Sequence, residues 1–101
     1  MNNRYEIAQE FAKTIKSKYI HKIILFGSVA RNEDTTGSDI DILIVSNYPE
    51  KIEDQSDDEV AWIMHDKSEL ISAHIMSEDR FNNTQHFSFL SNVLSEGIEL
   101  G

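Results

Sequence analysis

LFGSVAR at residues 25–31 and GSDIDIL at residues 37–43 are the two stretches of sequence on which the fold depends. The first closes an apolar, β-branched run, residues 22–26, with a glycine, which predicts a buried strand that ends in a tight turn. The second begins a run of alternating aspartate and isoleucine and predicts another strand over residues 39–45. The polar residues between the two strands predict a turn, one short helix and a loop.

Helical and strand patterns alternate through the rest of the chain. The predicted elements are a helix over 4–18, a helix that ends near Lys67, a strand over 70–76, a helix around 87–94 that Gly97 ends, and a short strand from Ile98 to Leu100. Residues 47–59 are expected to form an acidic surface connection. Asn2 or Asn3 is placed to cap the first helix, and Asp57 or Asp58 the second. This order predicts a single α/β domain over residues 1–101.

The composition excludes several classes of protein. The chain has 101 residues, no cysteine, and a net charge of −9 from 18 acidic and 9 basic side chains. Without cysteine there is no disulfide, thiolate metal site or cysteine nucleophile. The acidic balance argues against direct nucleic-acid binding, which relies on clustered cations. No apolar run approaches the ~20 residues that a bilayer requires, and the start does not resemble a secretory signal, so a cytoplasmic protein without membrane attachment is expected.

Asp39 and Asp41 are the first candidates for chemistry. Side chains alternate along a strand, so both carboxylates should emerge on one face, about 6.5–7 Å apart. They repel each other unless a cation lies between them. Hard oxygen ligands suit Mg²⁺, which keeps waters and takes its remaining ligands from substrate phosphates. The alternative is a pair of solvated aspartates on an edge strand.

The turn at Gly27 and Ser28 is the second candidate feature. Glycine lets the backbone approach a ligand closely, and Ser28 offers a hydroxyl and an N–H that favour an anion. Arg31 follows Ser28 by three residues and therefore shares its face on a helical turn. If the two strands are neighbours, the turn and the aspartates lie at the same end. An ordinary turn and a surface cation are the alternatives.

Gly27-Ser28, ten intervening residues and Asp39-Ile40-Asp41 together resemble the signature of the nucleotidyltransferase superfamily related to DNA polymerase β, in its minimal, single-domain branch. The resemblance implies an α+β fold with a short mixed sheet of three to four strands flanked by helices. It implies that Gly27 and Ser28 hold the triphosphate of ATP or another nucleoside triphosphate, and Arg31 and Ser38 are expected to bind the nucleotide beside them. It also implies that Asp39 and Asp41 bind Mg²⁺.

The resemblance carries an expectation about partners as well. Proteins of this branch are commonly paired with a HEPN partner in toxin–antitoxin systems, and some transfer AMP from ATP to the toxin. A chain of this size has little room for an acceptor-binding domain of its own, so the acceptor hydroxyl is expected on a partner protein. A homo- or hetero-oligomer is compatible with this expectation.

The strand over 70–76 departs from the family pattern. Active members add a third carboxylate on this strand, whereas the chain has His74 at roughly that place, as a weak metal ligand, a group that polarises a hydroxyl, or a packed residue. Asp66 and Glu69 would substitute only if the chain bends toward the site. Two functions therefore stay open: a transferase, or a module that neutralises its HEPN partner by binding alone.

Overall fold

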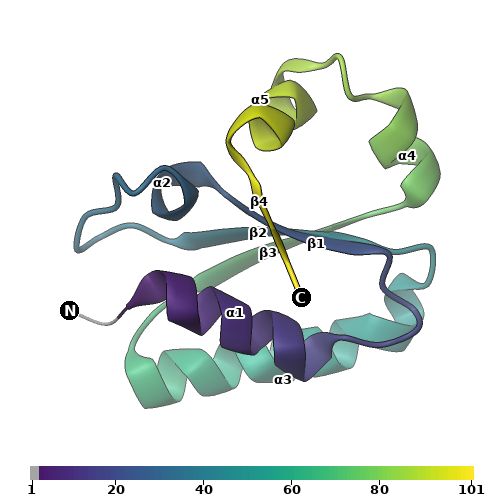
Figure 1. Cartoon of the computed structure of the whole chain (residues 1–101). Helices are drawn as coiled ribbons and strands as arrows, with labels where there is room; N and C mark the ends of the chain where they lie inside the picture. Colours follow the sequence, from purple (N-terminus) through teal and green to yellow (C-terminus); the bar gives the residue numbers. More distant parts are fainter. Residues whose placement is uncertain (1–2) are drawn as a thin grey trace.

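A four-stranded sheet runs through the computed structural model, which describes residues 3–101 (Figure 1). The strands lie in the order β3-β2-β1-β4, with β2 parallel to β3 and the other neighbours antiparallel. They are β1 (Lys22–Phe26), β2 (Ile40–Val45), β3 (Ile71–Met76) and β4 (Ile98–Leu100). The predicted short mixed sheet is therefore confirmed, and each predicted strand agrees within one residue.

Helices cover both faces of this sheet. They are α1 (Arg4–Ile15), α2 (Gly27–Ala30), α3 (Pro49–Lys67), α4 (Glu78–Asn83) and α5 (Ser88–Glu96). In Figure 1, α1 and α3 lie on one face, α4 and α5 lie on the other, and α2 follows β1 at one end of the sheet. α3 forms the crossover that the parallel β2–β3 pair requires. Within residues 3–101, no helix has both the length and the hydropathy to cross a membrane.

The central strand β2 is buried on both faces. Its three isoleucines pack in the same cluster as α1 and α3 residues, on the face opposite Asp41, as predicted. Leu43 and Val45 are equally buried, in a second cluster with Leu90 and Val93 of α5. A strand that is covered on both faces is apolar on both. The charge of β2 is therefore confined to the start of the strand, where Asp41 is the second residue.

Only the N-terminal end of α1 agrees with the sequence prediction. The Asn3 side chain accepts a hydrogen bond from the Glu6 N–H at 3.1 Å, as predicted, a cap worth about 1 kcal/mol. Asn2 lies outside the described residues. The helix ends at Ile15 rather than at residue 18, because Lys16 adopts an extended backbone with ψ 129°.

α3 begins at Pro49, so the prediction of a surface connection over 47–59 with a cap at Asp57 or Asp58 is wrong. Proline fits the first turn of a helix, where its missing N–H costs no hydrogen bond. Ile52 and Ser56 then recur at helical spacing and are buried, while most acidic side chains between them face solvent. The apolar stripe of this helix is narrow, and the many acidic residues around it made the sequence look like a surface loop.

The buried sides of α3 and α5 are narrower than the apolar residues of these segments indicate. Ile63, Leu90 and Val93 are buried. The neighbouring apolar residues that are exposed are Ala61, Trp62, Met64, Phe87 and Leu94. Each helix lies against the sheet along a single stripe, so apolar residues beside the stripe remain in solvent.

No repeating pattern in the sequence predicts α4. The Ser77 side chain caps it by accepting a hydrogen bond from the Arg80 N–H at 3.1 Å. Among its six residues only Phe81 is buried, and one apolar residue makes no period. α4 therefore depends on its cap and on a single anchor in the second core cluster.

Candidate active site

The turn after β1 brings Gly27 against β2. Phe26 pairs with Asp41 across the antiparallel β1–β2 ladder, so the chain leaves the sheet beside the Asp41 carboxylate. Gly27 has φ +74°, and a Cβ at this position would lie 2.3 Å from Asp41 Oδ2. Both the left-handed backbone and the closeness of the carboxylate require glycine. Because β1 and β2 are neighbours, the turn and the start of β2 meet at one end of the sheet.

Asp39 and Asp41 enter the site from the start of β2. Asp39 precedes the strand and is exposed, whereas Asp41 is half-buried beside Gly27. Burial raises the pKa of Asp41 above its ordinary value of 3.8, and the negative charge of Asp39 raises that pKa further. Ionised together, these carboxylates repel each other, so the pair favours a bound cation.

Arg31 supplies the positive charge beside the turn. Its Nη1 donates to Glu96 Oε2 at 2.7 Å, and its Nε donates to Glu33 Oε2 at 3.2 Å. The hydrogen bond to Glu96 is the main cause that raises the pKa of Arg31. The Arg31 charge also lowers the pKa of Asp41, so the guanidinium acts on this carboxylate through space.

Glu96 is a residue of this site that the sequence reasoning missed. Besides holding Arg31, it accepts a long hydrogen bond from the Gly27 N–H at 3.4 Å through Oε1. Its charge raises the pKa of Asp41. Glu96 is 65 residues from Arg31 in sequence, and it arrives here because α5 packs back onto the sheet. Gly97 predicts the end of a helix, but the sequence does not predict that Glu96, the last residue of this helix, contacts Arg31 and Gly27.

The two serines of the motif have different surroundings. Ser28 is half-buried in α2, and its hydroxyl makes no hydrogen bond within residues 3–101. Ser38 Oγ accepts a hydrogen bond from the Thr35 N–H at 2.9 Å and thereby closes the turn that leads to Asp39. The Ser28 hydroxyl is thus open to a ligand, while that of Ser38 shapes the loop.

His74 lies on β3, on the same face as Asp41. It is exposed and in register with Leu43, while Ser72 is in register with Asp41. The His74 ring centroid is 6.1 Å from that of Phe26, and Nε2 is 3.4 Å from Ser72 Oγ. The imidazole also lowers the pKa of Asp41. His74 is therefore within electrostatic reach of Asp41, on an edge strand.

Neither of the other two acids near β3 joins the aspartates. Glu69 is buried and accepts a hydrogen bond from Arg4 Nε at 2.9 Å. Asp66 is exposed on α3, with its Oδ2 3.8 Å from Lys67 Nζ. In the part of the chain that the structure describes, no group of three or more histidine, cysteine or acidic side chains could hold a metal ion by itself.

Arg4 fastens the loop that precedes Asp39. Its Nη1 donates to Asp34 Oδ2 at 2.9 Å and to the Thr35 carbonyl, and Nη2 donates to the Thr36 carbonyl at 2.9 Å. With Glu69, these partners leave Arg4 only 4% exposed. We call Arg4 and these partners the Arg4 clasp. It ties α1 to the α2–β2 loop and to Glu69, two residues before β3.

Mg²⁺ fits the donor set that the aspartates offer. Two carboxylates provide hard oxygen atoms and too few ligands for a closed site, which is the pattern for an ion that arrives with substrate phosphates.

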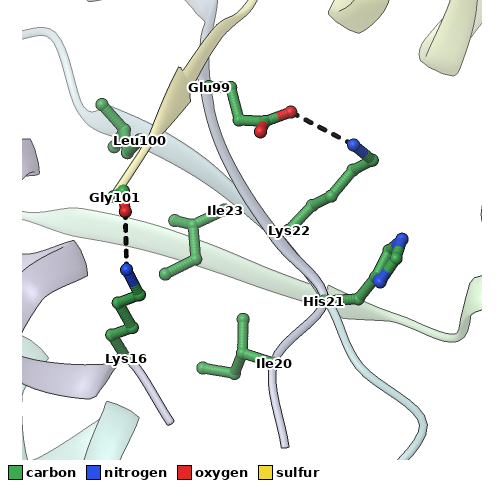
Figure 2. Close-up of a pocket in the computed structure, with 8 residues that line it drawn as sticks. All are labelled: Lys16, Ile20, His21, Lys22, Ile23, Glu99, Leu100 and Gly101. Atoms are coloured by element: carbon green, nitrogen blue, oxygen red, sulfur yellow. Dashed lines mark hydrogen bonds and ion pairs between the residues drawn. The ribbon is translucent and has the colours of Figure 1, made fainter. Parts of the chain in front are cut away.

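A cavity of about 210 Å³ lies elsewhere, near the start of β1 (Figure 2). It is lined by two lysines whose ammonium groups already have partners: Lys16 donates to the Gly101 carbonyl at 2.8 Å, and Lys22 pairs with Glu99 at 3.2 Å. Gly27 follows the opposite end of β1. This cavity is therefore separate from the aspartate pair.

A glycine turn that touches one of two paired carboxylates, with an arginine beside them, is typical of proteins that hold a phosphorylated ligand through a metal ion. The family comparison is more specific. The model of the nucleotidyltransferase domain matches residues 8–96, so the chain belongs to the nucleotidyltransferase domain family. This confirms the class of enzyme that the sequence predicts.

Relatives and a solved structure agree with this family. A protein of Methanocaldococcus jannaschii, named as a candidate protein adenylyltransferase, is 42% identical over 98 residues, which cover 94% of this chain and 95% of the relative. Another protein of the same organism, with the same designation, is 55% identical over 40 residues, 39% of this chain and 41% of its own. A candidate nucleotidyltransferase from Sulfolobus solfataricus, solved as a crystal structure, shares the fold at a TM-score of 0.54 and 17% identity, over 98% of this chain and 86% of that one.

Proposed function

We propose that this nucleotidyltransferase transfers the adenylyl group of ATP to a hydroxyl of a partner protein, with Mg²⁺ held by Asp39 and Asp41. The contact between the Gly27 turn and the Asp41 carboxylate carries the proposal, because a backbone that a phosphate can approach closely lies beside a carboxylate of the kind that binds Mg²⁺. The relative that matches almost the whole chain is named for protein adenylylation, which supports both the donor and the class of acceptor.

Each motif residue has a role in this proposal. The Gly27 and Ser28 backbone, the Ser28 hydroxyl and Arg31 bind the phosphates, and Ser38 sets the loop that delivers Asp39. Mg²⁺, when bound, neutralises the phosphate charge and polarises the reacting oxygens. His74 faces the same side as Asp41 from the exposed edge of the sheet, so it is placed to orient the acceptor hydroxyl.

The reaction is a substitution at the α-phosphorus of ATP. The acceptor oxygen forms a bond to this phosphorus, the bond from phosphorus to the α,β-bridging oxygen breaks, and pyrophosphate leaves. The hydroxyl proton passes to solvent. Catalysis of this kind depends on positioning and on charge neutralisation, which is what a turn, two carboxylates and a guanidinium supply.

A HEPN-type toxin is the partner that we propose, and the chain would act in the cytoplasm as its antitoxin. The open edge of β3 beside Asp41 supports an acceptor that comes from another protein, since Ser72 and His74 are accessible there. The acidic surface of α3 would speed the encounter with a basic partner.

Label transfer tests the proposal. Purified chain, MgCl₂ and ATP labelled at the α-phosphate are incubated with a HEPN-type protein encoded in the same genome, and labelled protein is detected after electrophoresis. We expect label on the partner, lost when Asp39 and Asp41 are both changed to asparagine. Equal labelling by wild type and by this double variant would contradict the proposal.

A second candidate function rests on β3. This strand carries no carboxylate, and residues 3–101 contain no cluster of three acidic or histidine side chains that could hold a metal by itself. A module that neutralises its partner by binding alone needs no such group. In that case the double variant Asp39→Asn, Asp41→Asn still protects cells from the toxin, whereas for a transferase the same variant does not.

A further inference from the structure

Glu96 contacts the Gly27 N–H and the Arg31 guanidinium, the groups that bind the phosphates in the proposed function. One oxygen of its carboxylate accepts from Arg31 Nη1 at 2.7 Å, and the other accepts from the Gly27 N–H at 3.4 Å. A carboxylate with these two contacts resembles two oxygens of a phosphate group, since both anions accept from a guanidinium and from backbone N–H groups. The chain itself therefore supplies an anion at the turn.

The position of Glu96 is fixed by the packing of α5. Leu90 and Val93 are each 1% exposed and anchor the helix on the sheet. At the helix end, a Cβ on Gly97 would lie 2.7 Å from Ile24 Cγ2, so the chain passes very close to β1 directly after Glu96. The carboxylate is thus presented to the turn by a buried scaffold and not by a free loop.

The charge balance opposes a triphosphate while Glu96 stays in place. Asp39 and Glu96 act on Asp41, and Glu33 and Glu96 pair with Arg31, so in these interactions between described residues four carboxylates share one guanidinium. The side chain of Glu96 is 20% exposed and that of Arg31 is 43% exposed, so both can change rotamer without unpacking the core.

We propose that Glu96 is an internal competitor of the nucleotide: its carboxylate occupies Gly27 N–H and Arg31 in the free protein, and the triphosphate must displace it to bind. Glu96 is then a positioning residue, which holds Arg31 ready at the turn but lowers the affinity for ATP. This inference rests on the proposed function, because it takes the turn as the phosphate site.

Calorimetric titration of the full chain with ATP and MgCl₂ tests the inference. Glu96→Gln should lower the dissociation constant roughly 3- to 10-fold, and the same gain should appear in the KM for ATP. Glu33→Gln is the matched control, since it removes the same charge from the other partner of Arg31 without touching Gly27. It should change the dissociation constant less than about 2-fold.

Two further variants separate competition from other effects. Glu96→Asp keeps the charge but shortens the reach, and it should also tighten ATP binding. Adding Arg31→Gln to Glu96→Gln should abolish the gain, because the freed guanidinium is then missing. In NMR spectra, the Gly27 amide of nucleotide-free Glu96→Gln should be displaced from its wild-type position, whereas Glu33→Gln should leave it in place.

The outcomes distinguish this inference from the proposed function. Weaker ATP binding by Glu96→Gln, or equal gains from Glu96→Gln and Glu33→Gln, would overturn the competition while label transfer by the wild type continued. If neither the wild type nor any variant binds ATP at millimolar concentration and no label is transferred, the proposed function fails, and the inference fails with it.

Discussion

Arg4 and Arg31 each hold two carboxylates, but in opposite surroundings. The side chain of Arg4 is 3% exposed and that of Arg31 is 43% exposed. The partners are Asp34 and Glu69 for Arg4, and Glu33 and Glu96 for Arg31. The adjacent acids Glu33 and Asp34 thus go to different arginines.

The difference in exposure indicates different roles for the two arginines. A buried guanidinium with four partners cannot exchange them, since an unpaired buried charge is very costly. An exposed ion pair contributes little to stability and exchanges partners readily. The Arg4 clasp therefore fixes the loop before Asp39, whereas Arg31, in the cluster with Glu96, Gly27 and Asp41, is able to exchange its partners.

The largest effect is expected from Gly27→Ala. The new Cβ would meet Asp41 Oδ2, and the alanine would have to adopt a left-handed backbone. The turn and the carboxylate must therefore separate. A displacement of about 1 Å at reacting groups costs roughly 100-fold in rate, so transfer should fall at least that far in a label-transfer assay. Gly37→Ala is the control, because a Cβ there has no atom within 4 Å. Similar rates for the two variants would show that the turn is not catalytic.

Arg4→Met tests whether the Arg4 clasp stabilises the fold. It leaves Asp34 and Glu69 as unpaired charges, one of them buried, and should lower the free energy of unfolding by about 3 kcal/mol in urea denaturation. Arg31→Met should scarcely move the melting temperature while it impairs ATP binding. An equal loss of stability in both variants would remove the distinction that we draw between the clasp and the exposed cluster.

A smaller effect is expected from Asp41→Asn on stability. Because the native pKa of Asp41 lies above its ordinary value of 3.8, the folded chain binds a proton more readily than the unfolded chain does. The stability contribution of this group is therefore lost as the pH rises from 3.8 through the native pKa. At pH 7, in buffer with a chelator, Asp41→Asn should melt slightly above the wild type. At pH 3 the two melting temperatures should converge. A lower melting temperature for the variant at pH 7 would contradict this account.

Asn3→Ala gives the smallest expected change. It removes the side-chain acceptor of the Glu6 N–H and should cost about 1 kcal/mol of stability, without a specific effect on transfer. Gln9→Ala, at an exposed position inside α1, is the control for helix content in thermal melts. A loss no greater than that of the control would mean that α1 does not depend on its cap.

The strands and the motif turn could be predicted because their signals are local. The run Lys22–Phe26 stopped by glycine, and the alternation after Asp39, each define a strand within a few residues. The start of α3 could not be predicted in this way, because acids fill the surface around Ile52 and Ser56 and hide the buried stripe.

The site could be predicted only where its residues belong to the motif. Gly27 directly follows β1, while Asp39 and Asp41 lie just before and within the start of β2, so the pairing of these two strands brings the three residues together. Glu96 reaches Arg31 through the docking of α5, and Arg4 reaches residues 34–36 through the packing of α1. Such contacts depend on tertiary structure, and nothing in the local pattern of α1 or α5 specifies them.

Chemical-shift mapping with Mg²⁺ and a non-hydrolysable ATP analogue would show directly where the nucleotide binds. We predict the largest amide shifts at Gly27, Ser28 and Asp41, at the end of β1 that meets the start of β2. The amides of Lys22 and Ile23, beside the cavity at the opposite end of β1, should stay in place (Figure 2). Shifts concentrated at that cavity, with none at Gly27 or Asp41, would contradict the account.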